Sequence, residues 1–162
     1  MICSDYNIAY SRRRFLKPCL TDHEIREMES LERLCFPPAE CYDVRTLRLF
    51  VSMNGIGILR YYDEAEESPR LVAFHLFDCI NGELITLDVH PNFRGRGIAT
   101  QLLQLSLNRL RDLGHTRATC EIAVDNEPSL RLHRKFGFVP VRLLHHYYGP
   151  GKHAYYLTAR LK

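Results

Sequence analysis

Residues 84–99 read Leu-Ile-Thr-Leu-Asp-Val-His-Pro-Asn-Phe-Arg-Gly-Arg-Gly-Ile-Ala, and this stretch decides the fold. The aliphatic and β-branched residues from Leu84 to Val89 are typical of a strand, which Pro91 ends. Residues 94–99 then predict the start of a helix with two glycines before it. Main-chain N–H groups at a helix start have no acceptor within the helix, so they can bind an anion beside two arginines. The stretch therefore predicts a strand, a phosphate-binding turn and a helix in succession.

The length and composition of the chain limit its class. Its 162 residues, 46% of them hydrophobic and 25% charged, suffice for one well-buried core and are too few for two, so we expect a single domain over residues 1–162. The net charge of +3 comes from basic residues spread along the chain, which does not indicate a nucleic-acid partner. No apolar segment is long enough to span a bilayer or to form the core of a signal peptide. We therefore expect a cytoplasmic protein with no membrane partner.

The cysteines and the paired histidines are interpreted as structural. The six cysteines are scattered without a Cys-x-x-Cys pair, and several lie in apolar runs, which is typical of reduced core residues. His145 and His146 have no partner ligand at a suitable spacing, which favours a structural role over metal binding. The sequence therefore predicts no metal site.

The element pattern around the central stretch indicates an α/β (α+β) protein. Thr21 and Glu24 form a capping box, and a helix with one apolar face is expected from there to the break at Phe36-Pro37-Pro38. The other expected elements are a first strand at 15–20, a helix at 43–53, strands at 58–62, 71–79 and 84–89, a helix at 97–113, a strand at 117–124, a helix at 125–137, and strands at 138–148 and 153–161. This β-αα-βββ-α-β-α-ββ order predicts a mixed, mostly antiparallel sheet of about seven strands with helices on both faces.

Two motifs carry a resemblance to a known family. Arg94, Gly97 and Ala99 occupy the fixed places of an Arg/Gln-x-x-Gly-x-Gly/Ala motif, and residues 126–138 are similar to an Asn-x-x-Ala-x-x-Leu-Tyr-x-x-x-Gly-Phe segment. Together with the element order, these motifs resemble the GCN5-related N-acetyltransferase (GNAT) family. The resemblance covers most of the chain and is closest from Glu83 onward.

Shorter patterns point to one branch of that family. Phe36-Pro37, Tyr147-Tyr148 and the closing Ala154-Tyr-Tyr-Leu157 look most similar to the bacterial ribosomal-protein-alanine N-acetyltransferases and to the eukaryotic N-terminal acetyltransferases. The chain departs from the branch at Tyr42, because the tyrosine that usually follows Phe-Pro closely comes late here.

The resemblance implies that acetyl-coenzyme A is the co-substrate. The main chain of residues 87–89 would hold the pantetheine and acetyl groups, residues 95–100 would hold the diphosphate, and Asn126 would bind the pantetheine arm. The alternative for Asn126, a helix N-cap, is compatible with that role. The expected cofactor-binding residues are Leu87, Asp88, Val89, Arg94, Gly95, Arg96, Gly97, Ile98, Ala99, Thr100 and Asn126.

Two residues are expected to move protons. Glu121 falls where the similar bacterial ribosomal-protein enzymes carry their general base, and a half-buried carboxylate beside an acyl donor can take a proton from an ammonium group. The alternative is a salt bridge to a nearby arginine. His133 falls where the family usually has the tyrosine that protonates the leaving thiolate, and imidazole can also donate a proton near neutral pH. The alternative is a histidine that only packs on its helix.

The acceptor is expected to be an amine. By resemblance, Phe36, Tyr42, Tyr147 and Tyr148 lie on the two loops beside the acceptor groove, where aromatic walls could grip a peptide N-terminus; ordinary core filling is the alternative. An α-amine has a pKa about two units below that of a lysine amine, which favours an N-terminal acceptor. The expected function is direct acetyl transfer, in a ternary complex, to a protein or peptide N-terminus by a monomer or homodimer. The alternatives are acetylation of a small amine and a non-catalytic acyl-coenzyme A-binding module.

Overall fold

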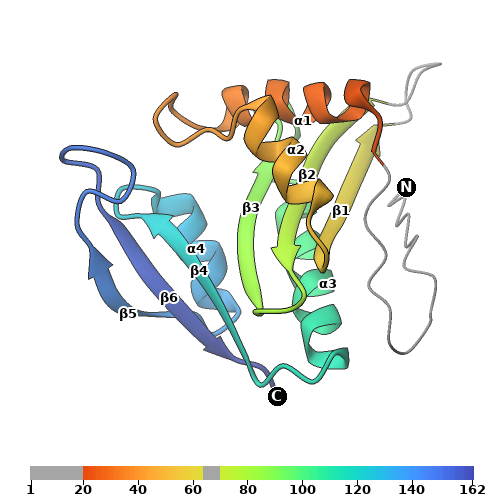
Figure 1. Cartoon of the computed structure of the whole chain (residues 1–162). Coiled ribbons are helices and arrows are strands. Elements are labelled where there is room, and N and C mark those ends of the chain that lie inside the picture. Colours follow the sequence, from red (N-terminus) through yellow and green to blue (C-terminus); the bar gives the residue numbers. More distant parts are fainter. Residues whose placement is uncertain (1–19, 64–69) are drawn as a thin grey trace.

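One mixed sheet forms the centre of the computed structural model, which describes residues 20–63 and 70–162 (Figure 1). Its order is β1-β2-β3-β4-β6-β5, and only β3 and β4 run parallel to each other. The strands are β1 (Ile56–Asp63), β2 (Arg70–Asp78), β3 (Glu83–Val89), β4 (Arg117–Ala123), β5 (Val139–Leu144) and β6 (Ala154–Arg160). The helices are α1 (Asp22–Cys35), α2 (Val44–Ser52), α3 (Ile98–Asp112) and α4 (Glu127–Lys135), with a 3-10 turn at Pro91–Phe93.

The predicted fold class is confirmed from residue 20 onward, with two differences. The expected strand at 15–20 lies outside the described residues except for Leu20, so the described sheet has six strands instead of about seven. The strand expected to reach residue 148 ends at Leu144. Residues 145–151 form a turn in which His146, Gly149 and Gly151 have positive φ, a conformation that cannot continue a strand.

Helix α1 begins and ends as its local sequence requires. The Thr21 N–H donates to the Glu24 carboxylate at 2.7 Å and the Glu24 N–H donates to the Thr21 hydroxyl at 3.3 Å, which completes the capping box. The apolar positions Ile25, Met28 and Leu31 are buried. Helix α1 ends before Phe36, where the predicted break lies.

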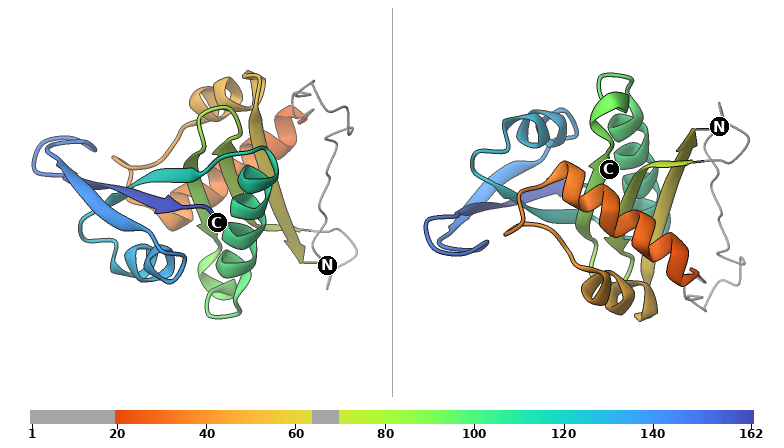
Figure 2. Two further views of the ribbon diagram at one scale, coloured as in Figure 1. Left: turned by 90° about the horizontal axis from the view of Figure 1, so that it is seen from below. Right: turned by 90° about the horizontal axis from the view of Figure 1, so that it is seen from above.

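The helices cover both faces of the sheet, as predicted (Figure 2). Helices α1 and α2 pack on one face around Met28, Leu47 and Phe74, while α3 and α4 pack on the other around Leu102 and Phe138. Burial of each such side chain stabilises the fold by roughly 1.5–3 kcal/mol. Within residues 20–63 and 70–162, none of the helices has the length and apolar character needed to cross a bilayer.

The two parallel strands separate soon after they meet, and this separation positions the site. Only Glu83 with Thr119 and Leu84 with Cys120 are paired across β3 and β4. A register shift between β2 and β3 falls directly after Leu84, and such a bulge bends a strand and increases its twist. Strand β3 therefore diverges from β4, as the V-shaped opening between them in Figure 1 illustrates.

Candidate active site

A single cavity of about 640 Å³ occupies the region where β3 and β4 diverge. Its walls come from β2, β3 and β4, the start of α3, one side of α4, the end of α1 with the loop after it, and the turn after β5. Among the predicted site residues, those that line it are Phe36, Tyr42, Leu87, Val89, Arg94, Gly95, Gly97, Ile98, Ala99, Thr100, Glu121, Asn126, His133 and Tyr148. The structure therefore brings most of the predicted donor, catalytic and acceptor residues to one place.

The start of α3 forms one end of the cavity. Gly97 is the N-cap in the left-handed conformation, φ 79°, and no side chain caps the helix. A Cβ built on either Gly95 or Gly97 would meet no atom within 4 Å, so open space lies in front of both glycines. Free N–H groups and the positive end of the helix dipole face this end of the cavity, which fits a diphosphate.

The two arginines of the turn differ in their roles. Arg94 lines the cavity, and its Nε donates to the Val89 carbonyl at 3.0 Å, which fixes the turn to the end of β3. Arg96 does not line the cavity. Its guanidinium stacks 4.7 Å from the Phe93 ring centre and donates to the Asn92 carbonyl at 3.2 Å.

Asp88 and Asn126 are placed by local hydrogen bonds. Asp88 is fully buried, accepts from the Thr86 hydroxyl at 2.8 Å and does not line the cavity. The Asn126 side chain accepts from the Ser129 N–H at 3.2 Å, which confirms the N-cap, while the residue also lines the cavity.

His133 lies in the cavity wall with a defined ring orientation. Its Nδ1 is 2.9 Å from the Ser129 carbonyl oxygen, and since a carbonyl can only accept, Nδ1 carries a proton. Burial lowers the pKa of His133 below its usual 6.5. The neutral ring therefore presents an unprotonated Nε2, and proton donation from that nitrogen requires the cationic form.

Glu121 lies half-buried in the middle of β4, on the opposite face from the core residues Cys120 and Ile122. Burial raises the pKa of Glu121 above its usual 4.5, and the nearby Glu83 carboxylate raises it further. No ion pair involving Glu121 occurs among the described residues, so the predicted alternative of a salt bridge is not observed. A raised pKa makes a carboxylate a stronger proton acceptor, which suits a general base.

Glu83 does not line the cavity, but it lies close enough to Glu121 to affect its pKa, and sequence reasoning missed it. Its register partner is Thr119, two residues before Glu121 on the same strand, and the period of two places Glu83 and Glu121 on one face. Burial and Asp78 raise the pKa of Glu83. Only the register between β3 and β4 could reveal this pair, since the two residues are far apart in sequence.

The acceptor side of the cavity is formed by the loop after α1 and the turn after β5. Tyr148 donates from its hydroxyl to the Glu121 main-chain carbonyl at 3.5 Å, and burial raises the pKa of Tyr148. Tyr147 does not line the cavity; it is 49% exposed and stands edge-on to Tyr148, with ring centres 4.8 Å apart. Glu40, a second missed residue, lines the cavity and lies 3.8 Å from Lys152, which joins the loop to the turn.

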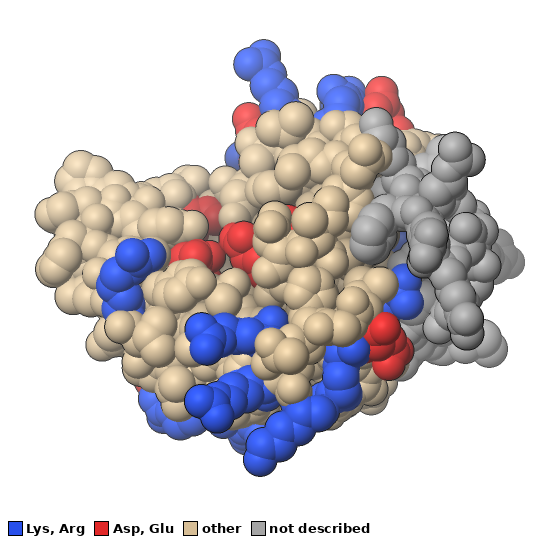
Figure 3. Space-filling view, turned by 60° about the horizontal axis from the view of Figure 1, so that its bottom comes forward, with Lys and Arg blue, Asp and Glu red and all other residues tan. Residues whose placement is uncertain are grey.

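One face of the molecule has a hollow that contains acidic side chains. Figure 3 shows Asp and Glu side chains recessed in a hollow between two lobes, with Lys and Arg side chains around its lower margin. Glu40 and Glu121 are the acidic residues that line the cavity. An acidic hollow attracts a positively charged acceptor such as an ammonium group.

Of the described cysteines, Cys79 and Cys120 are buried in the core as expected, whereas Cys35 and Cys41 are only half-buried. Cys35, Cys41, Cys79 and Cys120 are free thiols in the described part of the chain. Within residues 20–63 and 70–162, no group of three or more His, Cys, Asp or Glu side chains is arranged to hold a metal ion.

Strand β3 leads through a glycine turn into α3, and the parallel strand β4 then diverges from β3. This arrangement is that of an acetyltransferase fold. The family described as "Acetyltransferase (GNAT) family" matches residues 24–138. Since this match covers most of the chain, the protein belongs to the GNAT family.

Individual relatives refine the comparison. The chain is 35% identical over 81 residues to an N-alpha-acetyltransferase of Sulfurisphaera tokodaii, covering 49% of this chain and 48% of that protein. It is 34% identical over 117 residues to the N-alpha-acetyltransferase MAK3 of Arabidopsis thaliana, covering 64% of this chain and 62% of that protein. The chain thus spans about half to under two thirds of the length of these two relatives.

A solved structure supports the fold. The ribosomal-protein-S18-alanine N-acetyltransferase of Escherichia coli superposes with a TM-score of 0.74 at 14% identity, covering 88% of this chain and 91% of that chain. At this identity the likeness supports the fold alone.

Proposed function

We propose that this protein transfers an acetyl group from acetyl-coenzyme A to the N-terminal α-amine of a protein or peptide. The observation that carries the proposal is the continuity of one cavity from the uncapped start of α3 to Glu121 and Tyr148, through the opening between β3 and β4. The family and its N-alpha-acetyltransferase members support the same reaction.

The donor fits the α3 side of this cavity. The N–H groups of residues 97–100 would bind the diphosphate, since a helix start favours anions and the glycines leave room for close approach. The free edge of β3 at Leu87 and Val89 would hold the pantetheine and acetyl groups, and Asn126 would face the pantetheine arm. The bound donor supplies an activated thioester.

The acceptor enters from the acidic side. Glu121 takes a proton from the ammonium, directly or through a water, which frees the nitrogen lone pair. That lone pair forms the C–N bond to the thioester carbonyl carbon, and the C–S bond breaks with its electron pair remaining on sulfur. The main-chain groups of β3 stabilise charge that develops on the carbonyl oxygen. The nitrogen loses a second proton as the amide forms and the sulfur takes up one proton, so the proton held by Glu121 passes to solvent.

His133 is proposed as the source of the proton that the sulfur takes up. Since Nδ1 is bound to the Ser129 carbonyl, only Nε2 of the cationic ring can donate it. Burial lowers the pKa of His133, so the cationic form is confined to the acid side of neutrality.

The reaction is tested with acetyl-coenzyme A and a library of peptides with free N-termini, with detection of free thiol. Thiol release that depends on a peptide, together with acetylation at its N-terminus, supports the proposal. Thiol release with small amines but with none of the peptides would contradict the proposal. Tight binding of acetyl-coenzyme A without thiol release for any amine would also contradict it.

We predict that His133→Ala slows the chemical step in acid solution and has little effect at pH 8. The reason is that the cationic ring is lost as the pH rises past a pKa below 6.5. Single-turnover rates between pH 5.5 and 8.5 measure this, with acetyl-coenzyme A affinity nearly unchanged. His133→Tyr is expected to restore much of the rate.

Ser129→Ala is the matched control, because it removes the hydroxyl beside His133 and keeps the carbonyl that fixes Nδ1. Its rates are expected to equal those of the parent. Equal rates for His133→Ala and the parent throughout this range would remove His133 from the mechanism.

We also predict that Glu83→Gln moves the acid limb of the activity profile to lower pH. Loss of the Glu83 charge lowers the pKa of Glu121, so the base is deprotonated at lower pH. The measurement is kcat/KM between pH 5 and 9, with the exposed Glu127→Gln as control. Superimposable acid limbs for Glu83→Gln and the parent would show that the two carboxylates act independently.

A further inference from the structure

Two carboxyl groups are buried together beside the cavity, outside the reaction just described. Glu32 lies in the last turn of α1 and Asp88 lies in β3, and both have an exposed fraction of 0%. In the described part of the chain, neither forms an ion pair with a lysine or arginine. Burial of two unpaired negative charges side by side is strongly unfavourable.

The hydrogen bonds account for one oxygen of each group. Glu32 Oε2 accepts from the Tyr42 N–H at 3.2 Å, and Asp88 Oδ2 accepts from the Thr86 hydroxyl at 2.8 Å. Glu32 Oε1 and Asp88 Oδ1 are buried and receive no donor from the described residues. The two side chains lie within hydrogen-bonding reach of each other. Since an ionised carboxylate can only accept, one proton between the two groups satisfies both.

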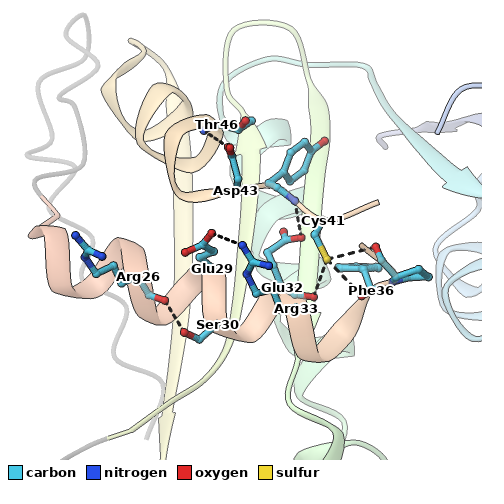
Figure 4. Close-up of polar contacts among 11 residues, drawn as sticks. Arg26, Glu29, Ser30, Glu32, Arg33, Phe36, Cys41, Asp43 and Thr46 are labelled. Carbon is cyan, nitrogen blue, oxygen red and sulfur yellow. Dashed lines mark hydrogen bonds and ion pairs between the residues drawn. The ribbon is translucent and has the colours of Figure 1, made fainter. Parts of the chain in front are cut away.

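Glu32 also organises the loop that follows α1. Its main-chain oxygen accepts from the Phe36 N–H at 2.9 Å and from the Cys41 thiol at 3.5 Å. Figure 4 shows the Glu32 carboxyl group pointing toward the main chain after Cys41, where the Tyr42 N–H donates to it. Residues 36–43, here called the acceptor loop, therefore fold over Glu32.

The partner of Glu32 belongs to the opposite side of the site. Asp88 lies between Leu87 and Val89, which line the cavity. The Cys35 thiol donates to the Val89 carbonyl at 3.3 Å, a second contact between the end of α1 and β3. The carboxyl pair thus connects the acceptor loop to the strand proposed to hold the donor.

We propose that Glu32 and Asp88 share one proton, and that this shared proton makes Glu32 a positioning residue that holds the acceptor loop against β3. The consequence for acceptor binding rests on the proposed function; the shared proton itself does not.

Burial agrees with a protonated pair. It raises the pKa of Glu32 from its usual 4.5 to about 7, and burial together with the Glu32 charge raises the pKa of Asp88 well above its usual value. A carboxyl pKa raised by folding stabilises the protein fully below the unfolded value, and this stabilisation is lost as the pH rises through the folded value. The stabilisation by the pair is therefore greatest at pH 4, where both groups are protonated, and it falls as the first proton leaves near pH 7 and the shared proton remains.

The buried titratable groups beside the pair keep one protonation state in this range. Burial lowers the pKa of His75, whose Nδ1 lies 2.6 Å from the Thr86 carbonyl oxygen, to about 4. Burial raises the pKa of the Cys35 thiol to about 12, and it also raises those of Cys41 and Tyr42. The charged groups around these neighbours are Arg94 near Cys35, and Arg33 and Glu40 near Cys41. Strand β2 places the uncharged Phe74 opposite Asp88.

The first experiment measures Tm between pH 5 and 8.5 for the parent, Glu32→Gln and Asp88→Asn. An amide donates to the remaining carboxylate without a titratable proton, so both variants are expected to lack the fall in Tm that the parent shows near pH 7. Glu29→Gln is the matched control, because it removes an ion-paired carboxylate from the same helix and should keep the slope of the parent. Parallel curves for the parent and both amide variants would overturn the shared proton.

The second experiment measures KM for the best acceptor peptide and the Kd of acetyl-coenzyme A. Glu32→Ala is expected to raise the acceptor KM about tenfold, the effect of losing one charge-assisted hydrogen bond, with the coenzyme Kd unchanged. Glu32→Gln is expected to restore the KM of the parent. An unchanged KM in Glu32→Ala would overturn the positioning role. If the parent acetylates no peptide, the proposed function fails, whereas the Tm experiment still decides the shared proton.

Discussion

Glu121→Gln is expected to lower kcat/KM about a hundredfold at pH 7, the lower range for loss of a general base. An N-terminal amine with a pKa of about 8 is mostly ammonium at that pH and must lose a proton before it attacks. Glutamine keeps the shape of the side chain but cannot accept that proton. The loss should shrink to a few fold near pH 9.5, where the amine is already neutral.

This result is measured as kcat/KM between pH 6 and 9.5, together with calorimetric titration of acetyl-coenzyme A. The coenzyme affinity should stay unchanged, because Glu121 lies on the acceptor face of β4. Glu127→Gln, an exposed carboxylate at the start of α4, should leave both quantities as in the parent. A Glu121→Gln rate equal to that of the parent across the neutral range would make Glu121 a structural residue.

Gly97→Val is expected to abolish the rise in Tm that acetyl-coenzyme A produces. A ligand at a hundred times its Kd stabilises the folded state by about 2.7 kcal/mol, which corresponds to roughly 5–10 °C for a domain of this size. A Cβ at Gly97 extends into open space at the start of α3, where the diphosphate is proposed to bind. The valine side chain would fill that space.

Strain from the positive φ at Gly97 must be separated from the steric effect. Gly114 provides the control, because its φ is +90°, its Cβ position is also open, and it does not line the cavity. Both valine variants should lower the Tm without ligand, since the left-handed conformation costs an L residue about 1–2 kcal/mol. Only Gly97→Val should lose the ligand-dependent rise. A full rise in Gly97→Val would refute the phosphate-binding role of this turn.

The donor half of the candidate site could be predicted from sequence because it is contiguous. Gly95, Gly97 and the first turn of α3 lie within a few residues of one another, and the N-cap at Asn126 is equally local. Two members of the predicted donor set do not line the cavity: Asp88 is fully buried, and Arg96 packs on Phe93. The acceptor half was less predictable: Tyr148 lines the cavity, whereas Tyr147 is turned outward by the conformation of the turn after β5.

By itself, the sequence determined the features whose hydrogen bonds close within a few residues. These are the capping box at Thr21, the break at Phe36 and the strand-turn-helix around Gly97. Such contacts depend on residue type and spacing alone.

Only the tertiary structure decided which distant groups meet. The proximity of Glu83 to Glu121 follows from the register of two parallel strands, and the pairing of Glu32 with Asp88 follows from how α1 packs across β3. The register shift between β2 and β3 falls where β3 begins to diverge from β4. Charge interactions and burial act through space, so the pKa shifts that give these carboxyl groups their chemistry arise only when the chain has folded.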